Sequence, residues 1–335
     1  MSQEMIPYEN QAPTIGQVAN SYAARSVFSD YQGRIAANTK RRQRDDLQLF
    51  AQFLASAGLQ VAPDDLYALP GTWQPMTYGL LEAFVRWQLQ QGYAIGSINV
   101  HLATVKKYCQ LAAKAGTIAP DEIALIKLVQ GFRQKEGRNA DEMREVSRVG
   151  RKKAEPVIIS FDQAQLLKQQ PDTAQGCRDA LLMCLLLDHG LRCGEIAELP
   201  ASAISLTSGT LTFYRRKVDK TQTHELMRDT LIAASRYFAI CQPGPSLLLG
   251  SRKGGHLQGR MSERAISDRA RVLCERIGLQ GVSAHDGRHA WATFAVRGGT
   301  DLKTLQDAGG WNSIVMPSRY AASQKIANRG VVLGR

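Results

Sequence analysis

The first half of the chain carries a helical repeat of apolar residues, and this pattern restricts the fold more than any other feature. From residue 38 to residue 132, large apolar side chains recur at spacings of three and four. A helix is expected to begin at Asn38 or Thr39, either of which can cap it. Its apolar face consists of Leu47, Phe50, Phe53 and Leu54. Further helices are expected over residues 78–90, 97–115 and 121–132, and together these segments predict a small helical bundle.

The second half has a mixed pattern, and strand-like alternation first appears after about residue 155. Residues 136–156 are charged and poor in large apolar side chains, which is typical of a linker. Beyond them we expect helices over residues 177–188, 260–277 and after residue 285, with strands over residues 211–214 and 223–227 around a charged turn. The predicted fold is mainly α-helical, with one small antiparallel sheet in the second of two domains.

The length of 335 residues allows two hydrophobic cores. The expected parts are an irregular lead-in (1–25), a helical domain (26–135), the linker (136–156), a second domain (157–320) and a C-terminal tail (321–335). The tail carries a weak apolar stripe, Ala321, Ala322, Ile326 and Ala327, that is too small to fold alone.

The charge balance indicates the class of partner. A net charge of +12 favours a polyanion such as nucleic acid. No apolar run reaches the ~18 residues of a membrane-spanning helix, and the first residues do not resemble a secretory signal, so we expect a cytoplasmic protein without a membrane partner. Six scattered cysteines without a C-x-x-C pair predict reduced thiols and no metal site.

A set of polar residues in the second half has the chemistry for attacking a phosphodiester without a metal ion. Arg192 follows the apolar helix, and Arg288 closes the run His285-Asp286-Gly287-Arg288. Trp311 lies 23 residues after Arg288, and Tyr320 lies nine residues further on. Arginine forks can bind the non-bridging oxygens of a phosphate, and a tyrosine hydroxyl can act as the nucleophile.

In spacing and residue type this set resembles the tyrosine recombinases, the integrase family that includes Cre and the Xer proteins. The run from Gly190 to Glu195 matches the family's first arginine motif, and Gly309-Gly310 matches the small residues before Trp311. The chain departs from the family pattern at Gly287, where leucine is usual, and at Pro317. The resemblance extends from about residue 38 to residue 320. It implies a helical core-binding domain and a catalytic domain that form a C-shaped clamp.

The resemblance also implies a mechanism without metal or cofactor. Arg192 and Arg288 would hold the scissile phosphate, while Tyr320 would form a 3′-phosphotyrosine link. His285 would exchange a proton or donate a hydrogen bond, and the Trp311 indole can only donate. Supporting roles fall to Glu195, which would orient a neighbouring side chain, and to His289, which would pack within its domain. Taken alone, Arg192 also fits a surface arginine paired with Glu195.

The family's general acid is a lysine in the hairpin turn, which protonates the leaving 5′-oxygen. An ungapped comparison with the common pattern Gly-Lys-Gly-x-Lys puts Lys217 in that place. The flanking glycines are missing here, so Lys220 stays an alternative. A basic turn that only touches phosphates is a further alternative.

Basic residues of the N-terminal helices are expected to contact DNA phosphates or to enter the major groove, as core-binding domains of this family do. These residues are Lys40, Arg41, Arg42, Arg44, Lys106 and Lys107. A solvated charged face is the alternative. The implied partner is double-stranded DNA with inverted half-sites, which a homotetramer would join as two duplexes. In the family the tail docks on a neighbouring subunit, and a frayed terminus is the alternative here.

Three functions fit these observations. The first is a site-specific DNA recombinase that integrates, excises or resolves DNA between two short sites. The second is a type IB topoisomerase, which nicks and reseals a single duplex, although the N-terminal helices resemble a recombinase core-binding domain. The third is a sequence-specific DNA-binding protein whose catalytic residues are vestigial. The complete set of Arg192, Lys217, His285, Arg288, Trp311 and Tyr320 favours the first.

Overall fold

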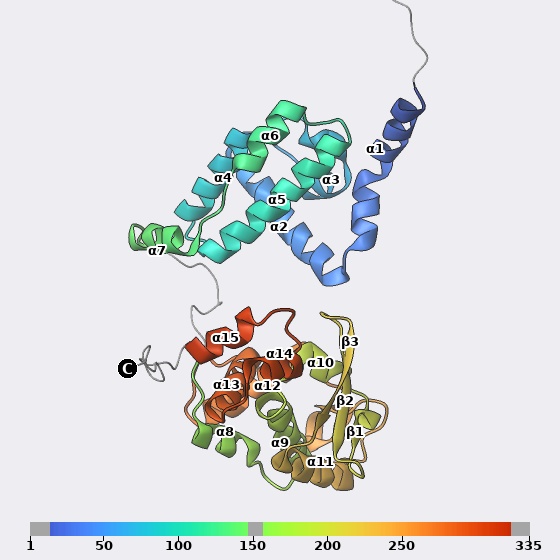
Figure 1. The fold of residues 1–335 in the computed structure, drawn as a ribbon, viewed down its shortest axis with the longest axis vertical. Helices are drawn as coiled ribbons and strands as arrows, with labels where there is room; N and C mark the ends of the chain where they lie inside the picture. Colours follow the sequence, from blue (N-terminus) through green and yellow to red (C-terminus); the bar gives the residue numbers. More distant parts are fainter. Residues whose placement is uncertain (1–13, 147–156, 323–335) are drawn as a thin grey trace, which may run out of the picture. The chain divides into compact units, whose positions relative to one another are not determined.

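The computed structural model describes residues 14–146 and 157–322, and the chain divides into two compact units, Met1–Arg151 and Lys152–Arg335 (Figure 1). The described residues are mostly helical, with two small antiparallel sheets, and this confirms the predicted fold class. The second sheet was not expected. The clamp-like arrangement of the two domains stays a prediction.

The first unit is a helical bundle around an aromatic core. Trp73 is fully buried and stacks with Phe50 and Tyr108, whose ring centroids lie 6.0 and 5.8 Å away. Its indole nitrogen donates to the carbonyl of Leu66 at 2.9 Å, so the polar atom is satisfied inside the core. The helices are α1 (Ile15–Arg34), α2 (Ala37–Ser56), α3 (Pro63–Ala68), α4 (Tyr78–Gln90), α5 (Ile95–Lys114), α6 (Pro120–Leu128) and α7 (Gln134–Glu142), with a 3₁₀ turn at Pro70–Trp73.

Two sequence-based expectations for the start of this unit are wrong. Residues 15–25, predicted to be irregular, form the first part of α1, because Thr14 and Gln17 make a capping box at its start. The α2 helix begins at Ala37, and its N-cap, Ala36, makes no side-chain hydrogen bond, so the caps expected at residues 38 and 39 are not used. The earliest residues of the predicted lead-in, 1–13, lie outside the described residues.

The predicted linker is helical at its beginning, which the sequence did not suggest. The α7 helix covers residues 134–142, and its Gly137 lies so close to Ile95 that an added Cβ would be 2.9 Å from Cγ2 of that side chain. Beyond the helix, Arg144 donates to the carbonyls of Leu89 (3.3 Å) and Tyr93 (2.9 Å). These contacts tie the polar segment to the bundle. Residues 147–156 lie outside the described part of the chain.

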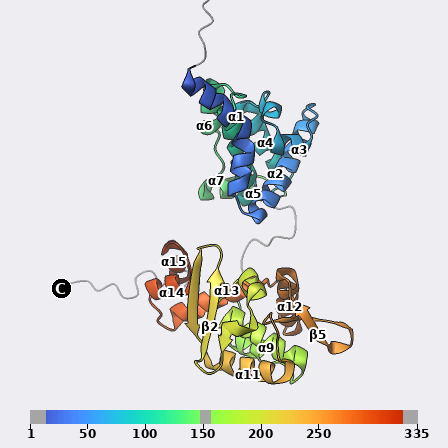
Figure 2. The same ribbon diagram turned by 90° about the vertical axis from the view of Figure 1, so that its right-hand side faces the viewer.

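The second unit is built around α9 (Ala174–Leu187), which lies among the other helices of this unit (Figure 2), and every residue from Gly176 to Leu187 is buried. Apart from Arg178 and Asp179 its buried residues are uncharged and mostly apolar, and a helix that is apolar on every side belongs in the centre of a core. Packed against it are α8 (Phe161–Lys168), α11 (Arg228–Cys241), α12 (Glu263–Arg276) and α13 (Ala284–Arg297). The remaining helices are α10 (Cys193–Glu198), α14 (Leu302–Gly309) and α15 (Val315–Ala322), with 3₁₀ turns at Ala201–Ala203 and Lys253–Gly255.

The larger sheet contains the expected hairpin, with strand order β1 (Ile204–Ser205), β2 (Thr210–Arg215) and β3 (Lys220–Glu225). Arg215 pairs with Lys220, so the turn consists of residues 216–219. Lys220 is thus the first residue of a strand and not part of the turn in which the sequence placed it. Asp219 takes the left-handed conformation that closes this turn, with φ of 50°.

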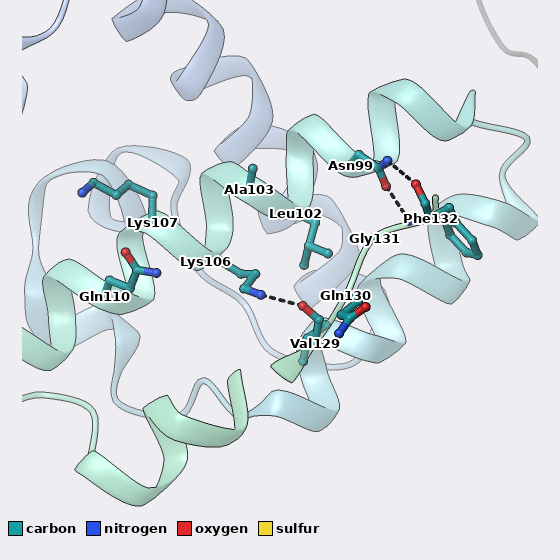
Figure 3. Close-up of a pocket in the computed structure, with 10 residues that line it drawn as sticks. All are labelled: Asn99, Leu102, Ala103, Lys106, Lys107, Gln110, Val129, Gln130, Gly131 and Phe132. Carbon is teal, nitrogen blue, oxygen red and sulfur yellow. Dashed lines mark hydrogen bonds between the residues drawn. The ribbon is translucent and has the colours of Figure 1, made fainter. Parts of the chain in front are cut away.

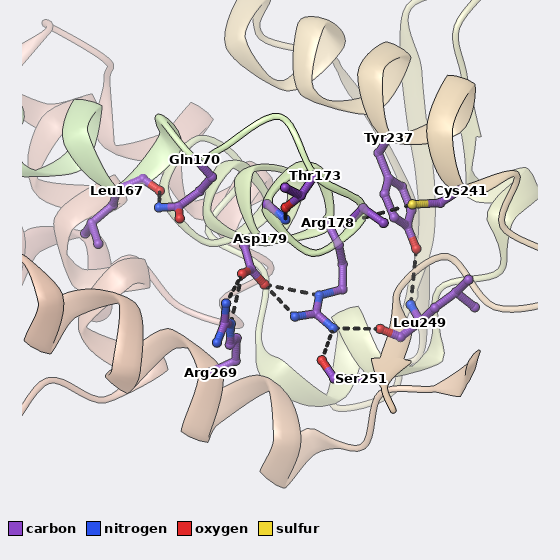
Figure 4. Close-up of polar contacts among 12 residues, drawn as sticks. Leu167, Gln170, Thr173, Arg178, Asp179, Tyr237, Cys241, Leu249, Ser251 and Arg269 are labelled. Carbon is purple, nitrogen blue, oxygen red and sulfur yellow. Dashed lines mark hydrogen bonds and ion pairs between the residues drawn. The ribbon is translucent and has the colours of Figure 1, made fainter. Parts of the chain in front are cut away.

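The unexpected second sheet, β4 (Leu249–Ser251) with β5 (Leu257–Arg260), is held by a buried ion-pair network (Figure 4). Arg178 of α9 donates to the carbonyl of Leu249 (3.0 Å) and to the hydroxyl of Ser251 (2.8 Å). Its charge is balanced by Asp179, which also accepts from Arg269 of α12. Arg178 and Asp179 are both fully buried, so the network fixes the root of this hairpin to the core.

No helix in residues 14–146 or 157–322 is long and apolar enough to cross a membrane. The six cysteines are free thiols, four of them buried. Within the same described residues, no three or more His, Cys, Asp or Glu side chains are grouped as metal ligands.

Candidate active site

Arg192 lies at the start of α10, where the chain leaves the core helix through Gly190. It is the N-cap residue of α10, and its guanidinium donates from Nη1 to Oε1 of Glu195 at 2.7 Å. The carboxylate also accepts from the backbone nitrogen of Arg192 at 2.8 Å. Although burial favours the neutral acid, Arg215 and Arg192 hold the pKa of Glu195 below its ordinary value. Glu195 is therefore a charged anchor that orients Arg192, whose side chain stays partly exposed.

Arg288 is fully buried on α13, and two backbone carbonyls fix its guanidinium. Nη1 donates to the oxygen of Gly190 at 2.6 Å, and Nη2 donates to the oxygen of Gly309. The guanidinium carbon lies 4.4 Å from the ring centroid of Trp311 and 5.7 Å from that of Trp291. Burial, together with neighbouring Arg192 and Arg215, lowers the pKa of Arg288. An anion bound here would relieve this accumulation of positive charge.

Both carbonyls that hold Arg288 belong to glycines, and the packing explains why. A Cβ on Gly190, which has φ of +60°, would lie 2.3 Å from the Trp291 ring. A Cβ on Gly309 would lie 2.1 Å from the Trp311 ring. Glycine at these two positions allows the indoles to approach the backbone closely, next to the guanidinium of Arg288.

Tyr320 lies in α15 with its side chain buried, next to the other predicted catalytic groups. Its ring centroid is 5.8 Å from that of Trp311 and 5.3 Å from that of His289. Burial raises the pKa of the Tyr320 hydroxyl, and the charges of Arg288 and Arg192 act in the opposite direction. The phenol is therefore protonated at neutral pH and must lose its proton as it attacks.

His285 completes this group on the first turn of α13. Its ring is edge-on to that of His289, with centroids 4.9 Å apart. Burial, His289 and Arg288 lower the pKa of His285, so the imidazole is neutral at pH 7 and can accept a proton. Asp286 next to it has a structural role, because its carboxylate accepts from the backbone nitrogens of Ser283 (2.6 Å) and Val157 (3.1 Å).

The structure thus gathers five of the six residues that the sequence singled out: Arg192, His285, Arg288, Trp311 and Tyr320. It does not bring either candidate lysine into contact with them. Lys217 is exposed in the turn of the β2–β3 hairpin, and Lys220 is exposed at the start of β3.

Sequence reasoning missed two residues that shape the site, Trp291 and Arg215. Trp291 stacks with Trp311 at 6.0 Å and lies near Arg288. Arg215 is fully buried and donates to both carboxylate oxygens of Glu195, at 3.0 and 2.9 Å. A run of Arg, Arg and Lys at the end of a strand suggests a solvated turn, and only the tertiary contacts identify its first arginine as buried.

The basic residues predicted to bind DNA differ in their surroundings. Arg41, Arg42 and Arg44 are exposed on α2, whereas Lys40 is half-buried. Arg42 lies 3.4 Å from Asp46, so part of its charge is compensated within the helix. Whether these side chains contact DNA stays a prediction.

Lys106 and Lys107 line a hollow of about 570 Å³ between α5 and residues 129–132 (Figure 3). The ammonium of Lys106 donates to the carbonyls of Lys127 (2.9 Å) and Val129 (2.5 Å), where α6 ends. Lys106 therefore caps the C-terminus of α6. Lys107 lies over the ring of Tyr31 at 4.8 Å.

The chain is similar in sequence to known tyrosine recombinases. Tyrosine recombinase XerC of Syntrophus aciditrophicus is 23% identical over 312 residues, which span 88% of this chain and 90% of that protein. Tyrosine recombinase XerD of Neisseria meningitidis serogroup B is 29% identical over 184 residues, 53% of this chain; the match spans 62% of that protein, less than two thirds of its length.

Two solved structures share the fold. One is the Tn1549 transposon integrase in complex with transposon right end DNA, with a TM-score of 0.63 at 14% identity over 91% of this chain and 96% of that one. The other is a lambda integrase dimer bound to a core site, with a TM-score of 0.59 at 17% identity over 92% and 97%. A model of the phage integrase family matches residues 158–326. Because that match covers just over half of its 335 residues, the chain belongs to the phage integrase family, the family of the tyrosine recombinases and hence of DNA strand transferases.

Proposed function

We propose that the chain is a site-specific DNA recombinase that cuts and rejoins strands through a 3′-phosphotyrosine intermediate. The observation that carries this proposal is the placement of Tyr320 beside Trp311 and within the field of two arginines, Arg192 and Arg288. A buried tyrosine next to two cationic forks has a nucleophile and an oxyanion site in one place.

In the proposed reaction the Tyr320 oxygen attacks the phosphorus of the scissile phosphodiester, and the bond to the 5′-oxygen breaks. Arg192 and Arg288 donate to the non-bridging oxygens, where negative charge grows in the transition state. The neutral imidazole of His285 takes the tyrosine proton or donates to the same phosphate. A 5′-hydroxyl from another duplex then reverses the step, so the bond energy is conserved.

The departing 5′-oxygen needs a proton, and the hairpin register favours Lys220 over Lys217 as its source. Directly opposite residues of an antiparallel pair have their side chains on the same face. Lys220 is opposite Arg215, whose side chain points inward to Glu195. Gln222 shares that face of β3 and contacts Arg215 as well. Lys217, the residue named by the ungapped family comparison, lies in the turn.

The proposed substrate is double-stranded DNA with two inverted half-sites, and the proposed assembly is a homotetramer on two duplexes. Two observations support DNA as the partner: the net charge of +12 and the fold shared with integrases whose structures were solved with DNA. A DNA substrate also agrees with the cytoplasmic location expected from the sequence. We further propose that the tail, whose residues 323–335 lie outside the described structure, docks on a neighbouring subunit.

A two-site plasmid assay separates this function from its alternatives. The preferred duplex would first be selected from random DNA with the purified protein, and two copies would then be placed in a supercoiled plasmid. A recombinase yields excised or inverted products. A type IB topoisomerase yields relaxed plasmid of unchanged sequence. A vestigial DNA-binding protein changes neither the supercoiling nor the sequence of the plasmid. Relaxation alone, or binding without any strand breakage, would contradict the proposal.

A further inference from the structure

We propose that Arg215 is a positioning residue that holds the lysine-bearing hairpin against the active site and thereby governs protonation of the leaving 5′-oxygen. This inference rests on the function proposed above. Arg215 does not itself touch the substrate in this proposal. It acts through the β2–β3 hairpin, and both candidate lysines lie within five residues of it along the chain.

The guanidinium of Arg215 is completely buried and uses each of its nitrogens. Nη1 donates to both oxygens of Glu195, Nη2 donates to the carbonyl of Ala308 at 2.7 Å, and Nε donates to the side-chain oxygen of Gln222. Its flat face lies over the ring of Phe213, with 4.7 Å between the guanidinium carbon and the ring centroid. A Cβ on Gly310 would be 2.4 Å from Cδ of this side chain, so the end of α14 packs directly against it.

Two of these contacts connect Arg215 to the surroundings of a predicted phosphate-binding arginine. Glu195 holds Arg192, so the first contact connects the hairpin to one phosphate-binding arginine. Ala308 immediately precedes Gly309, whose carbonyl accepts from Arg288, so the second contact connects the hairpin to the other. Gln222 adds a parallel connection, since its amide donates to the carbonyl of Asp307 at 2.6 Å.

The chemistry of the contacts argues for a role beyond packing. Burying a guanidinium has a desolvation cost that an apolar side chain of similar size would avoid. An apolar residue could fill the same space, but it could not bind a carboxylate, a carbonyl and an amide at fixed angles. The adjacent ion pair between Arg216 and Glu198 is exposed, and exposed pairs of this kind contribute little to stability. Arg215 is therefore the main polar anchor of the segment that presents the lysines.

The test compares Arg215→Met with wild type on two nicked duplexes of the selected site. One has a normal scissile phosphodiester, and the other has sulfur in place of the leaving 5′-oxygen. A thiolate leaves without needing a proton, so the second substrate bypasses the lysine. General acid catalysis contributes roughly 10²-fold or more. We expect Arg215→Met to slow cleavage of the normal duplex by about that factor and to cleave the sulfur-containing duplex at close to the wild-type rate.

Equal slowing on both duplexes, or no slowing on either, would overturn the inference, because a residue needed only for folding does not distinguish the leaving groups. If Arg215→Met does not fold, Gln222→Met is the variant to test. It is milder, because it removes the contact of Gln222 to Asp307 and keeps Arg215, and it should show the same selectivity between the two duplexes. The matched control is Arg216→Met, which changes the neighbouring exposed arginine and should leave both rates unchanged.

Failure of this inference is distinguishable from failure of the proposed function. If wild type forms no covalent adduct with either duplex, the proposed function fails. If wild type cleaves both duplexes and Arg215→Met loses both activities equally, the recombinase stands and only the role of Arg215 is refuted. Half-site affinity, measured for each variant, should stay at the wild-type value because Arg215 is buried away from solvent.

Discussion

Substitution of Asp179 by asparagine should destabilise the second unit strongly, although it changes the size of the side chain very little. Asp179 accepts from Arg178 at 3.1 and 2.8 Å and from Arg269 at 2.9 Å (Figure 4). Asparagine would replace one carboxylate oxygen by an NH₂ group facing a guanidinium, and it would leave the charge of Arg178 without compensation in the core. Removing one partner of a buried ion pair costs about 3–5 kcal/mol.

Hydrogen exchange of α9 peptides in the full chain, followed by mass spectrometry, measures this loss of stability specifically for the second unit. Amides of a central helix exchange through global opening of their unit, so a loss of about 3–5 kcal/mol accelerates exchange by roughly 10²- to 10⁴-fold. Peptides of α5 in the first unit provide an internal reference. The control is Asp268→Asn, which removes the exposed pairs with Arg271 (3.1 Å) and Arg264 (3.7 Å). Exchange of α9 in Asp179→Asn as slow as in this control would refute the reasoning.

Three further predictions concern the active site. Gly309→Ala should abolish cleavage but retain half-site binding, because the added Cβ would collide with the indole of Trp311. The control is Gly298→Ala, whose Cβ makes ordinary contacts at 3.4 Å, and it should stay active. Burial and nearby cations lower the pKa of His285, so its neutral form persists at pH 6.5. The second-order rate constant of cleavage should therefore decline only at lower pH. A pH–rate profile whose acid limb is centred above pH 6.5 would contradict this assignment. Lys220→Ala should slow cleavage of a normal phosphodiester and spare the sulfur-containing duplex, whereas the same selectivity in Lys217→Ala would favour the turn lysine.

Apolar periodicity predicted the helices that bury one face. The predicted range 78–90 has the same bounds as α4, because Thr77 caps its start and large apolar residues fill its inner side. The α1 helix was missed in part because Phe28 is its one buried residue, so its first turns carry no core-facing stripe. The α7 helix was missed because it is almost entirely polar and has no apolar face of its own; Gly137 is its one buried residue.

The residues of the candidate active site also fall into two groups, those that the sequence singled out and those that it did not. Chain order and spacing singled out Arg192, Arg288 and Tyr320, which lie near one another in the structure, because motif spacing along the chain is visible in the sequence; their catalytic roles stay a prediction. Arg215 was not predicted, since its burial depends on Glu195, 20 residues away, and on the carbonyl of Ala308, 93 residues away. A charged side chain is buried only when such distant partners converge, and local sequence contains no record of that convergence.

The most direct test of the central claim is to locate the covalent link by mass spectrometry. The protein would be incubated with a nicked duplex of its selected site, so that a small fragment diffuses away after cleavage and the adduct is trapped, and the protein would then be digested. The expected result is a peptide that carries a nucleotide on Tyr320, and no adduct is expected with Tyr320→Phe, which should still bind the duplex. A nucleotide on another residue, or an adduct that persists in Tyr320→Phe, would contradict it.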